Sequence, residues 1–266
     1  MTITSDANAV NSAIREPVPE LHTPETVAAT LQRGLIDPAT GLWQVDSEVR
    51  EMTGADEEYM ASLEAKNSVT YGEYMSKLLK RTVVNVGSIN ISDHPSALDN
   101  LTIGDRDILF LGVIKATYGS SKDFQISCGS CEKDNTVVMN LDEDFPIQTP
   151  SVDLRSTTSH TLRKGKVVKL RVPTSADNMQ IAKNSQSVSS QNTLMIAKCA
   201  VWEDGETPPT DLEAWAKALN VADRNDLVRS LLEIKAGPKI EAVNVPCAHC
   251  NEEMVIRIDW ISLLLS

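Results

Sequence analysis

Residues 101–141 have the sequence LTIGDRDILFLGVIKATYGSSKDFQISCGSCEKDNTVVMNL, and this stretch decides the fold. Thr102 and the acid three residues later form a capping-box-like start, with Asp in place of the usual Glu or Gln. The residues that follow, up to Tyr118, are apolar around most of a helical circumference, which is typical of a helix buried in the protein centre. We therefore expect a central helix over residues 105–118, ended by Gly119. A buried strand would have a similar pattern, but the length favours a helix.

The same stretch contains the first of two Cys-x-x-Cys motifs, each of which stands between two expected short strands. In a tight turn the two-residue spacing directs both thiolates toward one metal ion, and two such turns supply the four sulfur ligands of a structural zinc site. A segment of 115 residues separates the motifs, so its two ends must return to the same place. We predict one shared Zn²⁺ site, closed to catalysis, whose ligands are Cys128, Cys131, Cys247 and Cys250.

Two other interpretations of these four cysteines stay open. Four reduced thiols could simply pack beside one another, whereas a thioredoxin-like redox motif would need a helix start after a parallel strand instead of a hairpin. A disulfide framework does not fit five cysteines in an intracellular chain. The fifth, Cys199, lies in an apolar helical run and is expected to be an inert core residue. His249, between two proposed ligands, is expected to point outward.

Local patterns predict further helices and strands. Thr23-Pro24 is typical of a helix start and Gly34 of a helix end, so a short helix is expected between them. The other expected helices lie after Thr53, over residues 71–80, and, two to four in number, over 175–236, the clearest being 225–235 before Gly237-Pro238. Expected strands cover residues 41–52, 124–127, 136–141, 239–245 and 253–258, with an exposed strand or hairpin over 161–172.

These patterns together predict an α+β protein. Helices surround the central helix, and two Cys-x-x-Cys hairpins distant in sequence form a zinc-ribbon-like β-module. We expect four parts: an extended acidic N-terminal arm (1–22), an N-terminal α+β part with the first zinc knuckle (23–141), a mostly helical insertion with a basic hairpin (142–238), and a C-terminal strand pair with the second zinc knuckle (239–266).

Composition limits the class of protein. The chain has 266 residues, 41% of them hydrophobic and 23% charged, which suits one or two globular domains. Its net charge of −12 argues against general nucleic-acid binding, which needs a surplus of Lys and Arg. No apolar run approaches the roughly 20 residues of a membrane-spanning helix, and the N-terminal residues lack the pattern of a signal peptide. We therefore expect a soluble intracellular protein that contacts no membrane.

Charge is unevenly distributed along the chain. Residues 1–60 hold three arginines and no lysine against eleven acidic residues. Opposite charges on one chain suit docking against other proteins, although ordinary solvated surface explains them as well. A basic patch is expected from Arg155, Arg163, Lys164, Lys166, Lys169 and Arg171.

Motifs of catalysis are missing from the sequence. It contains no nucleophile elbow, no phosphate-binding glycine loop and no helix-borne pair of metal-binding histidines. Clusters of acidic residues occupy a helix start and a loop, where they complement the helix dipole or face solvent. We therefore predict that the protein is not an enzyme, has no catalytic residues and binds no small-molecule substrate.

Several of these segments resemble the T4-type baseplate hub and hub-assembly proteins of contractile-tailed bacteriophages. The resemblance covers residues 48–141 and 225–266, and its motifs are an Arg…Thr-Gly-x-Asp-Glu opening, an Asp-Arg-led apolar helix with a Tyr-Gly end, and two Cys-x-x-Cys motifs. It implies partners among other phage tail and baseplate proteins, in the host cytoplasm during assembly and in the virion tail baseplate. The residues that carry it are Arg50, Thr53, Gly54, Asp56, Glu57, Gly104, Asp105, Arg106, Tyr118, Gly119, Cys128, Cys131, Cys247 and Cys250.

Two hypotheses about function result. The first is a non-enzymatic structural or assembly component of a phage tail baseplate, which acts through protein–protein docking and has a structural zinc site. The alternative is a zinc-ribbon protein associated with nucleic acid or transcription. Charges beside the cysteine motifs are mixed over residues 122–134 and mostly acidic over 252–257, which is poor for phosphate contact. This favours the first hypothesis.

Overall fold

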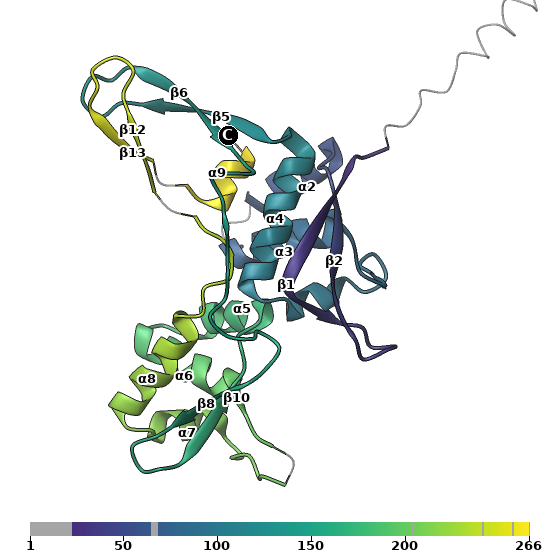
Figure 1. Ribbon diagram of the computed structural model, residues 1–266, viewed down its shortest axis with the longest axis vertical. Coiled ribbons are helices and arrows are strands. Elements are labelled where there is room, and N and C mark those ends of the chain that lie inside the picture. The colour runs from purple at the N-terminus through teal and green to yellow at the C-terminus, as the bar shows by residue number, and fades with distance from the viewer. Residues whose placement is uncertain (1–22, 65–68, 204, 241, 257, 266) are drawn as a thin grey trace, which may run out of the picture.

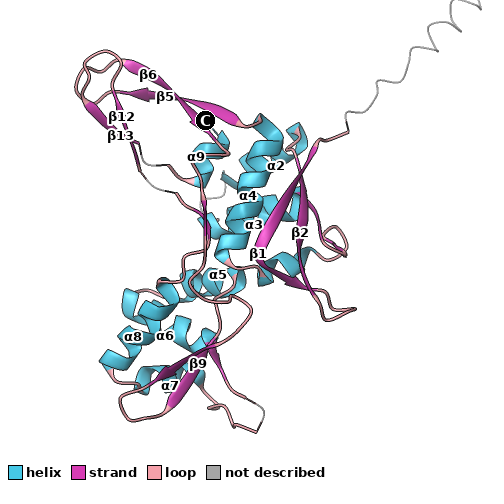
Figure 2. Cartoon of the chain, viewed as in Figure 1, coloured by secondary structure: helices cyan, strands magenta, loops and turns pink. Residues whose placement is uncertain are grey.

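The structure, a computed structural model, describes residues 23–266 apart from 65–68, 204, 241, 257 and 266, so the predicted N-terminal arm over 1–22 lies outside the described residues. Helices and strands are mixed, which confirms the predicted α+β class. Figure 1 shows three parts: a central body, a projection of β-hairpins, and a helical lobe at the opposite end. In Figure 2 the projection is built from strands and loops, whereas helices fill most of the body and the lobe. None of the described helices is long and apolar enough to cross a membrane.

A four-stranded antiparallel sheet forms one side of the central body (Figure 1). The predicted short helix between Thr23 and Gly34 is wrong, because this segment is a strand. β-branched residues and alternating burial let it pair with the following strand, and this pairing outweighs the local helix-start signal. The strands, in spatial order, are β1 (Thr26–Ile36), β2 (Trp43–Arg50), β3 (Val83–Val86) and β4 (Ile89–Asn90).

Helices complete the central body, and the predicted central helix lies in the middle of its core. Leu109, Phe110, Val113 and Ile114 on this helix are all fully buried. The helix ends at Gly119 as predicted, where φ is +84°. The helices are α2 (Gly54–Glu64), α3 (Tyr71–Thr82), the 3₁₀ helix η1 (Pro95–Asn100) and α4 (Ile103–Tyr118).

Asp105 joins the start of α4 to β1. The Thr102 hydroxyl accepts the backbone N–H of Asp105 at 3.1 Å, as the predicted cap requires. The carboxylate of Asp105 is used differently from a capping box: it accepts the backbone N–H groups of Gln32, Arg33 and Gly34 at 2.6–3.2 Å. These three residues lie where the pairing of β1 with β2 changes register. A buried carboxylate thus replaces strand acceptors at this bulge.

The hairpin projection consists of two antiparallel strand pairs. β5 (Ser121–Ser127) pairs with β6 (Asp134–Asn140), and β12 (Val243–Pro246) pairs with β13 (Glu253–Ile256). These are the strands predicted beside the cysteine motifs, with their ends shifted by a few residues. The largest shift is in β12, which begins four residues after the predicted start.

The insertion lobe, residues 158–232, has a hydrophobic core of its own. The predicted helices are present, but the clearest of them ends at Leu232 and not at residue 235. The predicted hairpin is present too, and its exposed tip carries Arg163, Lys164 and Lys166. The lobe contains β8 (Thr158–Thr161), β9 (Val167–Leu170), β10 (Ala200–Val201), α5 (Ser175–Asn184), α6 (Val188–Cys199), α7 (Leu212–Ala218) and α8 (Val221–Leu232).

A short ladder, the insertion stem, closes the lobe onto the central body. Its strands are β7 (Ile147–Gln148) and β11 (Gly237–Pro238), which pair antiparallel although Gly237-Pro238 is predicted only as a helix end. The Gln32 side chain on β1 forms hydrogen bonds with both strands. Its Nε2 donates to the Gln148 carbonyl at 2.6 Å, and its Oε1 accepts the Gly237 N–H at 2.7 Å. The chain therefore enters and leaves the insertion lobe at one place. This brings together the two cysteine hairpins that precede and follow the lobe in sequence.

Gly104, at the start of α4, packs closely against Gly237 of the insertion stem. A Cβ on Gly104 would lie 2.6 Å from the carbonyl carbon of Ala236. Because backbone must then move, we expect Gly104→Ala to lower the free energy of unfolding by about 1–3 kcal/mol. Gly54→Ala is the matched control, since no atom lies within 4 Å of its added Cβ. Chemical denaturation measures both variants, and an unchanged midpoint for Gly104→Ala would contradict the tight contact.

Helix α9 (Trp260–Leu265) returns to the central core after the second cysteine hairpin. The Trp260 ring lies 5.8 Å from the ring of Phe110 and 6.0 Å from that of Phe145. Lys122 on β5 donates from its buried ammonium to two carbonyls in the last turn of α9, at 2.6 and 3.1 Å. Burial lowers the pKa of Lys122 to about 8. The base of the projection is thus tied to the core.

Candidate metal centre

The four predicted ligand residues lie together at the outer end of the hairpin projection (Figure 1). Cys128 and Cys131 lie in the turn between β5 and β6, and Cys247 and Cys250 lie in the turn between β12 and β13. The four Sγ atoms are all within 4.8 Å of one another. Two distances join the turns: 3.7 Å from Cys128 to Cys250 and 3.7 Å from Cys131 to Cys247.

These separations fit a tetrahedral ion bound by four thiolates. With zinc–sulfur bonds of about 2.3 Å, two ligands of a regular tetrahedron stand about 3.8 Å apart. Both 3.7 Å distances connect one cysteine of the first turn to one of the second. The arrangement therefore suits one shared ion better than two separate two-cysteine sites.

The two cysteine turns have the same backbone geometry. In each, the N–H of the first cysteine donates to the carbonyl five residues later, at 2.9 and 2.8 Å. The N–H two residues after the first cysteine points at its Sγ, at 3.4 Å in both turns. The residue after the second cysteine has a positive φ, 57° for Glu132 and 61° for Asn251. Asn is common in this conformation and could have indicated the turn, whereas Glu gives no such signal.

Direct contacts hold the two turns against each other. The buried side chain of Asn135 accepts the Ala248 N–H at 2.9 Å and donates to the Lys133 carbonyl at 3.0 Å. The His249 side chain is exposed and is not part of the sulfur cluster, and its Nε2 lies 3.1 Å from the Asp134 carbonyl oxygen. Sequence patterns did not identify Asn135, because its role depends on a turn more than 100 residues away.

Cys247 and Cys250, in the second turn, differ in their affinity for protons. The His249 N–H, together with other donors, lowers the pKa of Cys247 to about 6. For Cys250, the Glu252 N–H favours the thiolate, but burial and the neighbouring thiols outweigh it and raise the pKa to about 12. Four thiolates this close together repel one another. A bound divalent cation removes that repulsion, so metal binding and loss of thiol protons are coupled.

Cys199, the fifth cysteine, is separate from this cluster. It lies fully buried in the hydrophobic core of the insertion lobe. Burial raises its pKa to about 12, which keeps the thiol protonated and unreactive. This environment agrees with the predicted inert role.

The six basic residues expected to form one patch are divided between different contacts. Arg171 pairs with Asp177 at 2.6 Å, and Lys169 pairs with Glu203. Arg155 stacks on an aromatic ring of β2 instead. Of the six, only the three at the tip of the β8–β9 hairpin lie together as predicted. The other three side chains have the partners named above.

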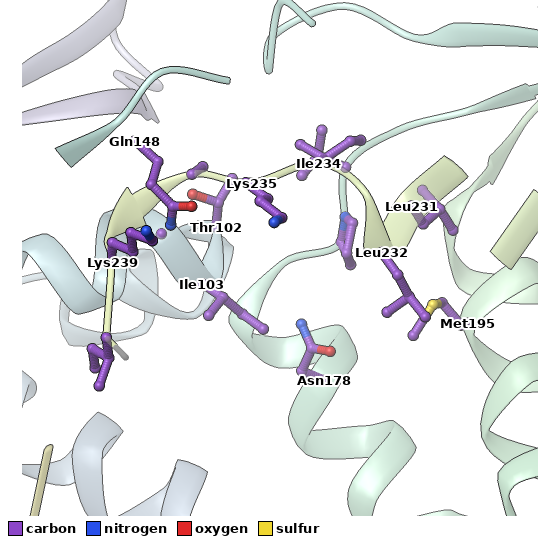
Figure 3. Close-up of a pocket in the computed structure, with 15 residues that line it drawn as sticks. Thr102, Ile103, Gln148, Asn178, Met195, Leu231, Leu232, Ile234, Lys235 and Lys239 are labelled. Atoms are coloured by element: carbon purple, nitrogen blue, oxygen red, sulfur yellow. The ribbon is translucent and has the colours of Figure 1, made fainter. Parts of the chain in front are cut away.

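A cavity of about 420 Å³ lies beside the insertion stem, where α4, α5 and α8 approach one another (Figure 3). Ile103, Leu231 and Leu232 form part of its apolar wall, and Lys235 and Lys239 supply its charge (Figure 3). Its lining residues include no carboxylate, histidine or cysteine. This cavity therefore does not bring together an acid, a base and a nucleophile.

Comparison with known proteins gives one match. The model of a protein family described as T4 bacteriophage base plate protein matches residues 40–264, which is most of the chain. Neither the curated proteins nor the solved structures include a significant match.

Proposed function

Because the chain belongs to the T4 bacteriophage base plate protein family, we propose that it is a non-enzymatic structural or assembly component of a phage tail baseplate. The match over residues 40–264 is the observation that carries this proposal. The protein acts by binding other tail and baseplate proteins. This binding takes place in the host cytoplasm during assembly and in the virion tail.

Zn²⁺ bound by Cys128, Cys131, Cys247 and Cys250 is the second part of the proposal. Four sulfur ligands fill the tetrahedral shell, so the ion supplies structural support and no catalysis. The chain's own residues orient the site: N–H groups point at sulfur in both turns, and Asn135 links the turns. The ion fastens two hairpins that the insertion separates in sequence, and it keeps the projection rigid for docking.

Metal content tests this part directly. We expect one zinc ion per chain after purification under reducing conditions, and a fall in thermal stability when a chelator removes it. Ser130→Ala is a control that leaves the four sulfur atoms in place, because the Ser130 side chain is exposed and only its backbone N–H faces sulfur. Less than one ion per chain, together with unchanged stability after chelation, would contradict the metal site.

Loss of the protein from the phage tests the baseplate role. We expect cells infected without it to produce no complete contractile tails, and the wild-type chain supplied in trans to restore them. Mass spectrometry of purified virions then distinguishes a retained component from an assembly factor that leaves. Normal tails in the absence of the protein would overturn the proposal.

The alternative, a nucleic-acid-binding zinc ribbon, has less support. Acidic and basic residues alternate around the first cysteine turn, and Glu252 and Glu253 follow the second. A polyanion would meet little positive charge at this end of the molecule. A mobility-shift assay showing tight, salt-sensitive binding of DNA or RNA would reverse this ranking.

A further inference from the structure

A second cavity, which we call the arginine pocket, lies between the central sheet and the insertion lobe. It has a volume of about 450 Å³ and is lined from β1, β2, η1 and the start of α5. Arg33 and Arg171 supply its positive charge, and Leu35, Ile36 and Ala97 contribute apolar surface. Ile36 remains half exposed at this place, at 51%. The carboxylate of Asp177 also lines it, so the pocket combines two cations, one carboxylate and an apolar wall.

Two arginines share the ring of Trp43, which lines the arginine pocket, although Arg155 is not itself a lining residue. The guanidinium of Arg33 lies 5.2 Å from the centre of the Trp43 ring, and that of Arg155 lies 5.5 Å from it. Arg155 also donates from Nε to the backbone carbonyl of Arg33 at 3.1 Å. Stacking holds the planar groups in place without using their hydrogen-bond donors. Two like charges thus gather at one tryptophan.

The carboxylates near the pocket are already engaged. Asp177 binds Arg171 through both oxygens, at 2.6 and 3.1 Å, and accepts the N–H and hydroxyl of Thr174. The Asp105 carboxylate accepts the backbone N–H groups at the β1 bulge. Among the described residues, neither Arg33 nor Arg155 forms an ion pair with a carboxylate. Asp105 and Asp177 are close enough to act on the charge of Arg33, but their oxygens are occupied by other donors. The hydrogen-bond donors of the two guanidinium groups thus remain available for a further carboxylate.

Arg33 has a donor that the described residues leave without a partner. Its Nε is buried and makes no hydrogen bond, and one terminal nitrogen reaches the Asn100 carbonyl at only 3.3 Å. Burial, followed by the charge of Arg171, lowers the pKa of Arg33. A buried N–H without an acceptor costs free energy that an arriving acceptor recovers. An acceptor that enters the pocket can therefore gain hydrogen bonds from Arg33 at little cost to the rest of the fold.

We propose that the arginine pocket binds an aspartate or glutamate side chain, next to an apolar residue, in a segment of a partner protein. The fork of a guanidinium matches a carboxylate, and a charge-assisted hydrogen bond is about twice as strong as a neutral one. The apolar wall with its exposed Ile36 suits the neighbouring side chain of a peptide. A nucleic-acid phosphate fits less well, because the net charge of −12 repels a polyanion.

Titration with a short peptide tests the proposal on the whole protein. The probe is acetyl-Leu-Glu-Leu-amide, and its uncharged match is acetyl-Leu-Gln-Leu-amide. The signal is the indole N–H of Trp43 in an NMR spectrum, assigned with Trp43→Phe. We expect a saturable shift at millimolar concentrations of the Glu peptide and at least tenfold weaker binding of the Gln peptide. Equal binding of the two peptides, or no saturable shift, would overturn the proposal.

Variants show which charges matter. Arg33→Gln and Arg155→Gln are each expected to weaken binding of the Glu peptide at least tenfold. Arg155 is exposed, so its replacement keeps the test valid if Arg33→Gln fails to fold. The matched control is Arg229→Gln, which removes an exposed arginine paired with Asp226 in the insertion lobe and should leave binding unchanged. If Arg229→Gln weakened peptide binding equally, the effect would come from the overall charge of the protein. That result would refute binding at the arginine pocket.

Inorganic phosphate distinguishes the sources of the anion. We expect it to bind at least tenfold more weakly than the Glu peptide, because it does not use the apolar wall. Phosphate binding as tight as that of the peptide would reject a protein partner. These measurements use isolated protein and do not involve the cysteine cluster. Failure of the metal site or of the baseplate role is therefore distinguishable from failure of this inference.

Discussion

Replacing Cys128 by Ser is expected to release the metal from all four cysteines and not from one turn alone. The reason is the cross-turn geometry, in which each 3.7 Å contact joins a sulfur of one hairpin to a sulfur of the other. Zinc binding contributes about 10 kcal/mol or more to folding in small zinc domains. An ion shared by the two turns would also close a loop of more than 100 residues, which would restrain the unfolded chain by a few kcal/mol. We expect a large fall in melting temperature, and loosening of β12, β13 and α9.

A double-mutant cycle decides whether the ion is shared. Cys128→Ser and Cys247→Ser should each abolish most zinc binding, so the double variant should lose little more than either single one. Zinc content and thermal stability are measured for all four proteins of the cycle. Additive losses, with half of the metal left in each single variant, would rule out one shared site. Ser130→Ala gives the baseline for a substitution in the turn that spares the sulfur atoms.

Asp56→Asn is expected to cost about 3–5 kcal/mol of unfolding free energy, which is typical of breaking a buried ion pair by removing one partner. The Asp56 side chain is fully buried and binds Arg50 and Arg81 at 2.7 Å each. It also accepts the N–H and hydroxyl of Thr53, at 3.0 and 2.9 Å. One carboxylate thus joins the end of β2, the start of α2 and the end of α3. Asp226→Asn, at an exposed pair, should change stability by less than about 1 kcal/mol.

The same carboxylate makes stability depend on pH. Burial by itself raises the pKa of Asp56, but hydrogen bonds from Arg50, Thr53 and Arg81 outweigh it and hold the pKa well below its usual value. Its contribution is therefore complete above the unfolded-state pKa of about 3.9 and is lost as pH falls toward the lower folded-state pKa. Urea denaturation from pH 7 to pH 3 should show the wild type approaching Asp56→Asn as the acid increases. The stability difference between the two proteins should be constant at neutral pH and should narrow below about pH 4. A difference that stays constant down to pH 3, or that widens in acid, would contradict the low folded-state pKa of Asp56.

The parts of this fold that sequence patterns predicted are those whose signals are local. The apolar circumference of residues 105–118 predicted α4, and the spacing of the cysteines predicted a four-sulfur cluster that the structure brings together. The match over residues 40–264 confirms the resemblance to T4-type baseplate proteins that these motifs suggested, and the hub role within that family stays a prediction. In each case the signal lies in short motifs of neighbouring residues, although the cysteine cluster needed two such motifs.

The missed features depend on contacts between distant residues. Thr23-Pro24 is a good helix start, but β1 forms because β2 offers a partner and Asp105, about 70 residues later, accepts its bulge N–H groups. The insertion stem likewise depends on Gln32, which reaches Gly237 across 205 positions. Nothing in the sequence positions of Arg33 and Arg155 suggests that both lie over the ring of Trp43. Pairings of this kind are fixed by tertiary packing, which overrides local propensity.

Packing of α9 against α4 determines when the core closes during translation. The Tyr118 hydroxyl at the end of α4 donates to the Leu264 carbonyl, a contact that spans 146 positions. At about 5–20 residues per second, a ribosome takes roughly 7–30 seconds to make the intervening chain. Throughout that time α4 is present without Trp260, Leu263 and Leu264, so apolar surface stays open to chaperones and to wrong partners. Nascent chains stalled before α9 should therefore bind a hydrophobic dye that the finished protein excludes.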